Sequence, residues 1–389
     1  MEIVQAKRLQ SLPPYLFIEI DRKKRRALAE GRDIINLGVG DPDQPTPSFI
    51  VQAMQKAAAE PANHRYPFDE GVPEFRREAA KFLKSRFGLD IDPQRELITT
   101  IGSKDGISHL PLAVVDPGDV VLVPQPGYPV YQSATMFAGA EPYIMPLRQE
   151  NGYYPDLGAI PPQVARKARL MYLNYPNNPT AAVADRSFYE QAVAFAQRYD
   201  ILIASDAAYC ETYFSQRPMS ILEVEGARDV AIEFHSLSKT FNMTGWRLGF
   251  AVGNAQAVSA LARLKTNMDS GQFNAVQWAG VEALANWEHP EVQAIRDMYC
   301  QRRDALVDGL NNKLGWQVKK PQATFYVWIN CPKGIGSMEL VARLLDEADV
   351  LTIPGVGFGS AGEGYIRAAL TVDVQRIREA IDRISKVKL

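Results

Sequence analysis

The stretch HSLSKTFNMTGWRLG, residues 235–249, surrounds one lysine with three groups that bind anions. Lys239 follows the hydroxyls of Ser236 and Ser238, and Arg247 lies eight residues further on. A lysine buried near another cation loses affinity for its proton and can then bind a carbonyl group covalently. Two hydroxyls and a guanidinium are suitable ligands for a phosphate group. The stretch therefore predicts a reactive amine beside a phosphate site.

The same stretch begins at the end of a predicted buried strand, and similar strands occur throughout the middle of the chain. They are short apolar runs bounded by Gly, Pro or Asp, at 96–102, 119–126, 141–147, 168–176, 201–206, 229–238 and 247–253. Helical segments such as 185–200 separate them, which favours an α/β fold with a mostly parallel sheet. Ligands of such sheets bind beyond the carboxyl ends of the strands. Four side chains are expected to meet there, those of Ser103, Asn178, Asp206 and Lys239.

The pattern changes near residue 285. A long helical segment (291–312) precedes predicted strands at 323–331 and 364–370 and a terminal helix, which is typical of a small α+β domain. The first 45 residues are expected to join this domain, because residues 36–47 resemble a connecting loop. The predicted domains are a large one, 46–285, and a small one made of 1–45 and 286–389.

Further chemical groups occupy the ends of predicted strands or lie within them. Asp206 ends an apolar strand, so its carboxylate suits a buried cationic partner, and Tyr209 follows it as a hydrogen-bond donor. Asn178 offers another donor in an Asn-Pro turn. Arg367 lies in an apolar strand, and its planar guanidinium matches a carboxylate. Structural roles, such as a helix cap for Asp206 or an internal salt bridge for Arg367, are compatible with the same positions.

Two turns add to this set. The glycine turn before Ser103 and Lys104 leads into a predicted helix, and the free N–H groups at the start of a helix bind phosphate. Tyr128, in the Pro-rich turn PGYPVY, is placed either to stack on a bound ring or to pack within the turn.

Composition argues against several classes of function. The net charge is −2, which gives no reason to expect nucleic acid or an anionic membrane as a partner. No apolar run reaches the roughly 18 residues of a membrane-spanning helix. The 3 cysteines and 4 histidines lack the spacing of a metal site, so no metal is expected. The cysteines also form no disulfide pattern, which favours the cytoplasm.

Taken in order, these residues resemble the class I/II aminotransferases, which are fold-type I enzymes that use pyridoxal 5'-phosphate. The resemblance covers essentially the whole chain, and SLSKTFNMTGWRLG is its most specific part. It implies a large domain with a mostly parallel seven-stranded sheet flanked by helices, plus a smaller α+β domain. The residues that carry it are Tyr66, Ser103, Lys104, Tyr128, Asn178, Asp206, Tyr209, Ser236, Ser238, Lys239, Arg247 and Arg367.

The resemblance also implies a role for each residue. Lys239 would hold the cofactor aldehyde and move the substrate proton, and Asp206 would pair with the pyridine nitrogen. Asn178 and Tyr209 would hold the phenolate oxygen. The phosphate would be bound by a larger group, namely Ser103, Lys104, Ser236, Ser238 and Arg247.

The remaining roles concern substrate and partner. Tyr128 would stack on the cofactor ring, and Arg367 would bind the substrate α-carboxylate. Tyr66 would reach the phosphate in a neighbouring subunit, which implies an obligate homodimer with shared sites. Ala181 departs from the family pattern, because many relatives have glycine after Asn-Pro-Thr.

Residues 12–47, 102–107 and 173–185 resemble the LL-diaminopimelate aminotransferases in particular. That resemblance implies transfer of an amino group between glutamate and tetrahydrodipicolinate on the route to lysine. The implied substrate contacts are Tyr15, Gly40, Lys104, Tyr128, Asn178 and Arg367. The substrate carries an amine and a carboxylate at its distal end, so it needs polar partners there, and Lys104 is suited to the carboxylate.

Other activities are compatible with the same residues. Lys104 would also suit aspartate, and alanine or broad-specificity transamination is equally open. A carbon–sulfur lyase or an aminocyclopropane carboxylate synthase would keep the same cofactor residues. A pyridoxal-sensing transcription regulator fits less well, because the aminotransferase pattern begins almost at once and leaves no room for a DNA-binding region.

Overall fold

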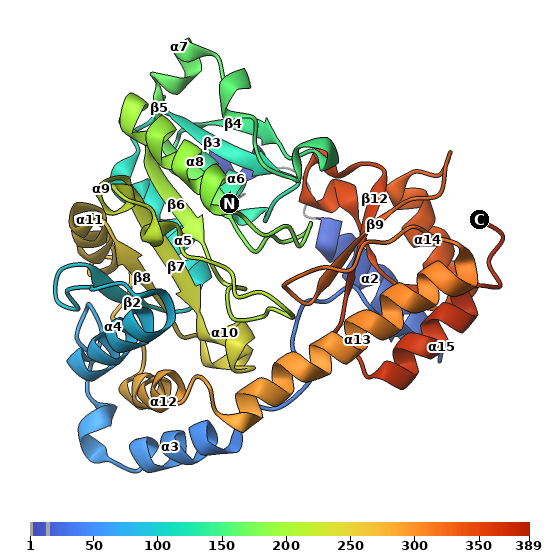
Figure 1. Cartoon of the computed structure of the whole chain (residues 1–389), viewed down its shortest axis with the longest axis horizontal. Helices are drawn as coiled ribbons and strands as arrows, with labels where there is room; N and C mark the ends of the chain where they lie inside the picture. Colours follow the sequence, from blue (N-terminus) through green and yellow to red (C-terminus); the bar gives the residue numbers. More distant parts are fainter. Residues whose placement is uncertain (1–2, 13–15) are drawn as a thin grey trace.

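A seven-stranded sheet forms the centre of the larger part of the molecule (Figure 1). The computed structural model describes residues 3–12 and 16–389. The strands are β2 (Leu97–Thr100), β3 (Val120–Gln125), β4 (Glu141–Pro146), β5 (Ala168–Asn174), β6 (Leu202–Asp206), β7 (Ala231–Ser236) and β8 (Gly249–Gly253). Their order is β2-β8-β7-β6-β5-β3-β4, and β8 runs antiparallel to both of its neighbours. All seven predicted strands are present, and the sheet is mostly parallel, as predicted.

Helices cover this sheet, and its central strands are buried on both faces. Every residue of β3 and of β7 is buried, as expected for a sheet packed between helices. The helices of this part are α3 (Ser48–Ala58), α4 (Pro73–Phe87), α5 (Ser103–Val114), α6 (Val130–Phe137), α7 (Pro162–Ala165), α8 (Arg186–Tyr199), α9 (Ala227–Val230), α10 (Leu237–Thr240), α11 (Ala255–Lys265) and α12 (Asn274–Ala285). Helix α8 shows why the segment folds this way. Asp185 caps its first turn by accepting from the Phe188 N–H, and Asp200 ends it with a left-handed backbone.

The smaller part contains an antiparallel sheet in the order β11-β12-β9. Its strands are β9 (Tyr326–Asn330), β11 (Ile353–Pro354) and β12 (Tyr365–Ala369), and its helices are α2 (Leu16–Ala29), α13 (Pro290–Leu314), α14 (Ser337–Ala348) and α15 (Val374–Ile384). The long α13 runs diagonally from the larger part into the smaller one (Figure 1). Near the N-terminus, β1 (Ile35–Asn36) pairs in parallel with β10 (Val350–Leu351). The N-terminal segment therefore packs with the C-terminal part of the chain.

The sheet register brings polar residues together at one edge. Asn174 is paired with Asp206 at the carboxyl ends of β5 and β6. The last residue of β7, Ser236, lies at the same edge and begins the turn that carries Lys239. Strand β12 brings Arg367 from the smaller part. The edge where parallel strands end is therefore closed by residues from both parts of the chain.

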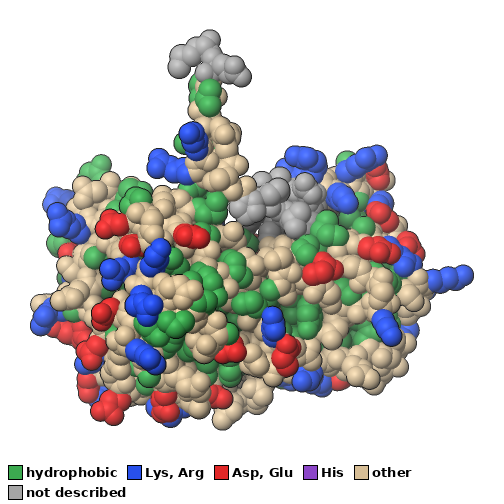
Figure 2. Space-filling view, turned by 90° about the horizontal axis from the view of Figure 1, so that it is seen from above, with side chains coloured by type: hydrophobic (Ala, Val, Ile, Leu, Met, Phe, Trp, Pro, Cys, Tyr) green, Lys and Arg blue, Asp and Glu red, His purple; other side chains and the backbone are tan. Residues whose placement is uncertain are grey.

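Residues 3–12, which include the short helix α1 (Lys7–Gln10), stand off the body as a narrow arm (Figure 2). The arm exposes apolar side chains, with Ile3 83% and Val4 78% exposed. Within the described ranges of the chain, no helix combines the length and the apolar character needed to cross a membrane.

The turn after Asn178 contains a strained alanine. Ala181 has φ of 59°, in the left-handed region, and is buried. Because this conformation costs an alanine about 1–2 kcal/mol, the position favours glycine. We expect Ala181→Gly to leave the free energy of unfolding unchanged or raise it by up to about 1 kcal/mol. The matched change at the neighbouring Ala182, whose φ is not positive, should lower it by about 1 kcal/mol. Urea denaturation measures both, and an equal loss at the two positions would contradict the argument.

Candidate active site

A cavity of about 290 Å³ lies where the carboxyl ends of β5, β6 and β7 meet the smaller part of the chain. The predicted residues that line it are Gly40, Ser103, Lys104, Tyr128, Asn178, Asp206, Tyr209, Ser236, Ser238, Lys239, Arg247 and Arg367. Tyr66 does not line it and is 87% exposed. Tyr15 lies outside the described residues. A larger surface hollow beside α11 contains none of the predicted residues, so the smaller cavity is the candidate site.

Lys239 presents an amine of reduced basicity to this cavity. It lies in α10, directly after β7, and its Nζ donates to the backbone oxygen of Gly40 at 3.1 Å. Burial lowers the pKa of Lys239 to about 8; the Asp41 carboxylate opposes this shift, and the positive charges of Arg247 and Arg367 add to it. A lowered pKa increases the fraction of neutral amine, which is the form that attacks a carbonyl group.

Asp206 is a buried carboxylate at the end of β6. Its Oδ2 accepts from the Tyr131 hydroxyl at 2.7 Å and its Oδ1 from the Ala208 N–H at 3.1 Å. Burial raises the pKa of Asp206 to about 6, although both hydrogen bonds act to lower it. Among the described residues, no lysine or arginine forms a salt bridge with this carboxylate. A buried carboxylate in this state is suited to a cationic group inside the cavity.

Arg367 and Asn178 meet across the two parts of the chain. Arg367 Nη1 donates to Asn178 Oδ1 and Nη2 to the backbone oxygen of Gly38, both at 2.8 Å. The guanidinium also lies over the rings of Tyr326 and Phe358, at 4.1 and 4.7 Å from their centroids. The Asn178 amide oxygen is occupied by Arg367, and within residues 3–12 and 16–389 no acceptor is assigned to its NH₂ group, which is therefore left for another acceptor. The Tyr209 hydroxyl lies 3.0 Å from that of Tyr326.

The groups predicted to bind phosphate gather at the N-terminus of α5. Gly102 precedes this helix with φ of 75°, a conformation that favours glycine, and a Cβ on it would lie 2.5 Å from Arg247 Nη2, so a side chain there would displace the guanidinium. Arg247 Nη1 lies 3.5 Å from Ser238 Oγ. Free N–H groups, two serine hydroxyls and a guanidinium thus surround one end of the cavity, which is a suitable donor set for a phosphate dianion.

Several lining residues were not predicted from the sequence: Asp41, Asn174, Ala208, Thr244, Tyr326 and Phe358. Tyr131, the partner of Asp206, was also missed. Tyr326 and Phe358 belong to the smaller part and resemble ordinary core residues in the sequence, so no local signal marked them. Asp41 follows Gly40 directly, and its charge next to a predicted contact was a usable signal.

The residues present fit the cofactor that the sequence predicts. The Asp206 carboxylate suits a protonated ring nitrogen, and the Asn178 amide and Tyr209 hydroxyl suit a phenolate oxygen. Ser103, Ser238 and Arg247 line the cavity and suit a phosphate, and Lys239 supplies the amine for an aldehyde. The cavity volume is close to the lower end of the range for small-molecule sites.

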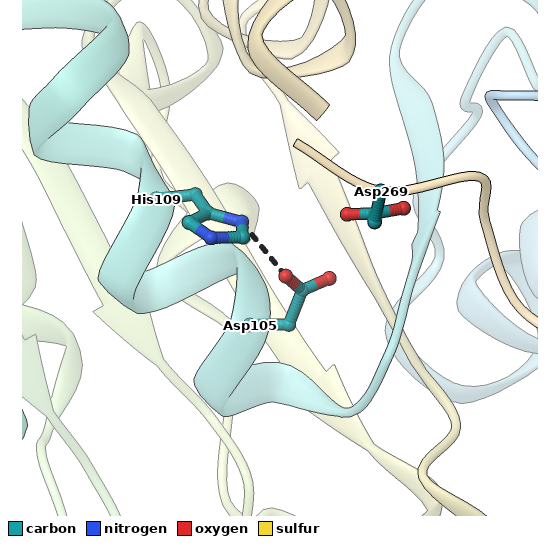
Figure 3. Close-up of side chains that lie close together, drawn as sticks. All are labelled: Asp105, His109 and Asp269. Atoms are coloured by element: carbon teal, nitrogen blue, oxygen red, sulfur yellow. Dashed lines mark ion pairs between the residues drawn. The ribbon is translucent and has the colours of Figure 1, made fainter. Parts of the chain in front are cut away.

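A second group of titratable side chains lies behind the Gly102 turn. Ligand atoms of Asp105, His109 and Asp269 lie within 4.8 Å of one another (Figure 3). Asp105 pairs with His109 Nδ1 at 2.8 Å, and Lys265 Nζ contacts both carboxylates, reaching Asp269 at 2.8 Å. Burial acts to raise the pKa of Asp105, but the hydrogen bond with His109 and the charge of Lys265 outweigh it and lower the pKa to about 2. Lys265 therefore supplies the positive charge that a metal ion would bring to this cluster.

Asp105 also positions the Gly102 turn, since its Oδ2 accepts from the Ile101 N–H at 2.9 Å. Its own N–H donates to the Gly102 oxygen at 3.1 Å. The buried Lys265 cluster thus holds the segment 101–105 in place from behind the cavity.

Comparison with known proteins places these features in a family. A family model described as aminotransferase class I and II matches residues 32–384. The chain is 54% identical over 388 residues to the LL-diaminopimelate aminotransferase of Syntrophobacter fumaroxidans, covering 100% of both chains. It is 54% identical to that of Aquifex aeolicus, covering 98% of both. A substrate-bound BacF structure from Bacillus subtilis shares 41% identity with a TM-score of 0.95, over 100% of this chain and 99% of that one.

Replacing Lys265 by methionine would leave two carboxylates without their cation. Lys265 is 1% exposed, and breaking a buried ion pair costs about 3–5 kcal/mol, so the free energy of unfolding should fall by about 3 kcal/mol at pH 7. The folded-state pKa of Asp105 lies below its unfolded value, so its stabilising contribution is lost as pH falls towards about 2. The difference between the variant and the unmodified protein should therefore shrink below pH 4. Urea denaturation across pH measures both effects.

Lys81→Met is the matched control, because the Lys81 side chain is 71% exposed although it also pairs with a glutamate. It should change the free energy of unfolding by no more than about 0.5 kcal/mol. Equal losses in the free energy of unfolding at positions 265 and 81 would show that the buried ion pairs of Lys265 stabilise the fold no more than an exposed ion pair does.

Proposed function

The chain belongs to the aminotransferase class I and II family, and from that premise we propose that it transfers an amino group from LL-diaminopimelate to 2-oxoglutarate, with pyridoxal 5'-phosphate as cofactor. The products would be tetrahydrodipicolinate and glutamate, a step of lysine biosynthesis. The observation that carries the proposal is one cavity that joins a largely buried amine of lowered pKa, a buried carboxylate and, at the start of α5, a set of donors suited to phosphate. Relatives 54% identical along their whole length bear the name of this activity.

Pyridoxal 5'-phosphate supplies an aldehyde that accepts the amino group and a cationic ring that stabilises negative charge at the substrate Cα. Asp206 would hold the ring nitrogen, and Asn178 and Tyr209 would hold the phenolate oxygen. Tyr128 would stack on the ring. The phosphate would be held by the α5 N-terminus and the side chains around it: Ser103, Lys104, Ser236, Ser238 and Arg247.

Lys239 would both hold the cofactor and move the proton of the reaction. Its pKa of about 8 means that a useful fraction of the amine is neutral near neutral pH, so Nζ can accept the proton from the substrate Cα. The resulting Lys239 ammonium would then give this proton to the cofactor carbon that bears the transferred amino nitrogen. The Gly40 oxygen, 3.1 Å from Nζ, is placed to orient the amine during both steps.

Substrate recognition would begin at Arg367, whose planar guanidinium matches the α-carboxylate. Lys104, at the start of α5, lines the same cavity and suits the distal carboxylate of diaminopimelate or the side-chain carboxylate of glutamate. One residue would then serve both substrates of the exchange. Gly40 would add a backbone contact, and Tyr15, outside the described residues, would complete the set.

We also propose that two copies of the chain share their sites. Tyr66 is 87% exposed and lies away from the cavity of its own chain. Close to it in the sequence, Phe68 is 64% exposed. Met268 is 54% exposed, and Gly271 of the same loop lies against Pro67. Exposed apolar side chains of this number in one region are typical of an interface. A second copy covering them would bring Tyr66 to the phosphate end of the neighbouring cavity.

Domain limits and cellular location are part of the same proposal. A large domain of residues 46–285 and a small one of 1–45 with 286–389 are supported by the pairing of β1 with β10. The three cysteines of the chain are free, which is compatible with the reducing cytoplasm.

The test of this function is a half-reaction with single amino donors. The pyridoxal form of the enzyme is mixed separately with LL-diaminopimelate, meso-diaminopimelate, aspartate, alanine and glutamate, and conversion to the pyridoxamine form is followed by absorbance. We expect LL-diaminopimelate and glutamate to react fastest. Lys239→Ala should abolish the conversion and remove the absorption band of the covalently bound cofactor. Fast conversion by aspartate without any by LL-diaminopimelate would refute the substrate assignment while leaving the chemistry intact.

Arg367→Lys tests carboxylate recognition. A lysine keeps the charge but loses the planar pair of donors, so kcat/KM for every amino donor should fall by about 100-fold or more. The loss should be of similar size for LL-diaminopimelate and alanine, because both carry the same α-carboxylate. Steady-state kinetics measures it, and a loss confined to the longer donor would place Arg367 at the distal end instead.

A further inference from the structure

Tyr131 does not line the cavity, but it contacts two residues that do, Asp206 and Tyr128. It is fully buried in the first turn of α6, and its hydroxyl donates to Asp206 Oδ2 at 2.7 Å. Its ring packs edge-on against Tyr128, with centroids 5.8 Å apart, and stacks on Tyr172 at 4.8 Å. The residue therefore contacts both the carboxylate and the aromatic ring that face the cavity from different elements.

The hydroxyl of Tyr131 is a permanent donor. Burial and the neighbouring Asp206 carboxylate raise the pKa of Tyr131 well above its usual value, so the phenol keeps its proton at every working pH. A donor that never ionises can only favour the charged form of the carboxylate that it contacts. Of the side chains around Asp206, Tyr131 provides the hydrogen bond that most opposes the effect of burial.

We propose that Tyr131 is a positioning residue of this site, whose hydroxyl fixes the orientation of the Asp206 carboxylate and keeps it ionised for a cationic ring nitrogen. The inference rests on the proposed cofactor. It explains why Oδ2 is occupied by a neutral donor and not by a cation: a lysine or arginine there would neutralise the carboxylate and weaken its attraction for the ring. The Ala208 N–H on Oδ1 completes the fixed geometry.

The test measures cofactor binding to the apoenzyme, with two cofactors that differ at one atom. Pyridoxal 5'-phosphate carries the ring nitrogen, and its 1-deaza analogue has a C–H group in that place and therefore has no cation for Asp206. Dissociation constants are measured by fluorescence titration for the unmodified chain, Tyr131→Phe and Tyr172→Phe. The preference for pyridoxal 5'-phosphate over the analogue is the quantity that reports on Asp206.

We expect Tyr131→Phe to reduce this preference by about 10-fold or more, the ratio that loss of one hydrogen bond to a charged group gives. Tyr172→Phe is the matched control. Tyr172 is equally buried in the same ring stack, but its hydroxyl donates to the Ile107 oxygen at 2.9 Å. It should leave the preference unchanged. Equal weakening for both cofactors in Tyr131→Phe would reduce Tyr131 to a packing residue and overturn the proposal.

A second measurement uses stability without cofactor. The folded-state pKa of Asp206 is raised to about 6, so burying this group costs stability as pH rises through that value. Loss of the Tyr131 donor raises the pKa further, so Tyr131→Phe should lower stability more at pH 8 than at pH 5. His235 and Glu233 of β7 also act on Asp206 electrostatically, but both are present in either variant. A pH-independent loss, like that expected for Tyr172→Phe, would contradict the proposal.

The remaining outcomes are also decisive. If Tyr131→Phe does not fold, the double variant with Asp206→Asn should restore folding, because it removes the carboxylate charge that Tyr131→Phe leaves without its side-chain donor. Failure of this rescue would refute the inference. If the unmodified apoenzyme does not bind pyridoxal 5'-phosphate at all, the proposed function itself fails. Normal binding with an unaltered preference in Tyr131→Phe would refute only the inference about Tyr131.

Discussion

The separation of Lys239 from Asp206 inside one cavity is the constraint on which the rest of the structure depends. A buried amine and a buried carboxylate attract each other strongly, and a salt bridge between them would fix both charges. Instead, Lys239 donates to the Gly40 oxygen, and Asp206 accepts from Tyr131 and from the Ala208 backbone. Each group keeps a neutral partner, and each pKa is shifted towards neutrality, to about 8 and about 6. The two groups therefore remain available to a third one between them.

Maintaining this separation costs stability, and the fold compensates for it elsewhere. Burying ionisable groups without opposite charges is unfavourable, and the backbone around the site is strained as well. Arg247 has φ of 57° and Asn242 has φ of 51°, in the left-handed region that side chains rarely adopt. The neighbouring strands β3 and β7 are entirely buried, and the buried Lys265 cluster fixes the Gly102 turn from behind. The buried strands and the Lys265 cluster thus stabilise the strained backbone around the cavity.

The sequence predicted the elements better than their contacts. Apolar runs with β-branched residues located every strand of the seven-stranded sheet, because burial on both faces leaves a strong local pattern. The antiparallel direction of β8 was not predictable, since the pattern of a buried strand does not encode its direction. The two-residue strands β1 and β10 are too short for any periodicity. Tyr131 was missed for a related reason: its bond to Asp206 spans 75 positions of sequence, and a buried tyrosine looks like core.

The N-terminal segment shows why chemistry and recognition are difficult to separate in this site. The Gly38 oxygen accepts from Arg367, and the Gly40 oxygen accepts from Lys239. Gly40 cannot carry a side chain, because a Cβ there would lie 2.0 Å from the Tyr326 hydroxyl, which in turn contacts Tyr209.

The same short segment therefore contacts both groups of the reaction. It holds Arg367, which is proposed to bind the substrate carboxylate, and Lys239, which is proposed to move the substrate proton. Lys239 would act on the substrate Cα and Arg367 on the carboxylate bonded to it, so the two side chains must reach neighbouring atoms of the same molecule. A change in segment 38–40 would alter both at once, whereas a lining residue such as Lys104, for which the described part of the chain shows no hydrogen bond to this segment, can vary with the distal group of the substrate. Specificity can then change while the reaction stays the same, as expected for a fold that serves many amino donors.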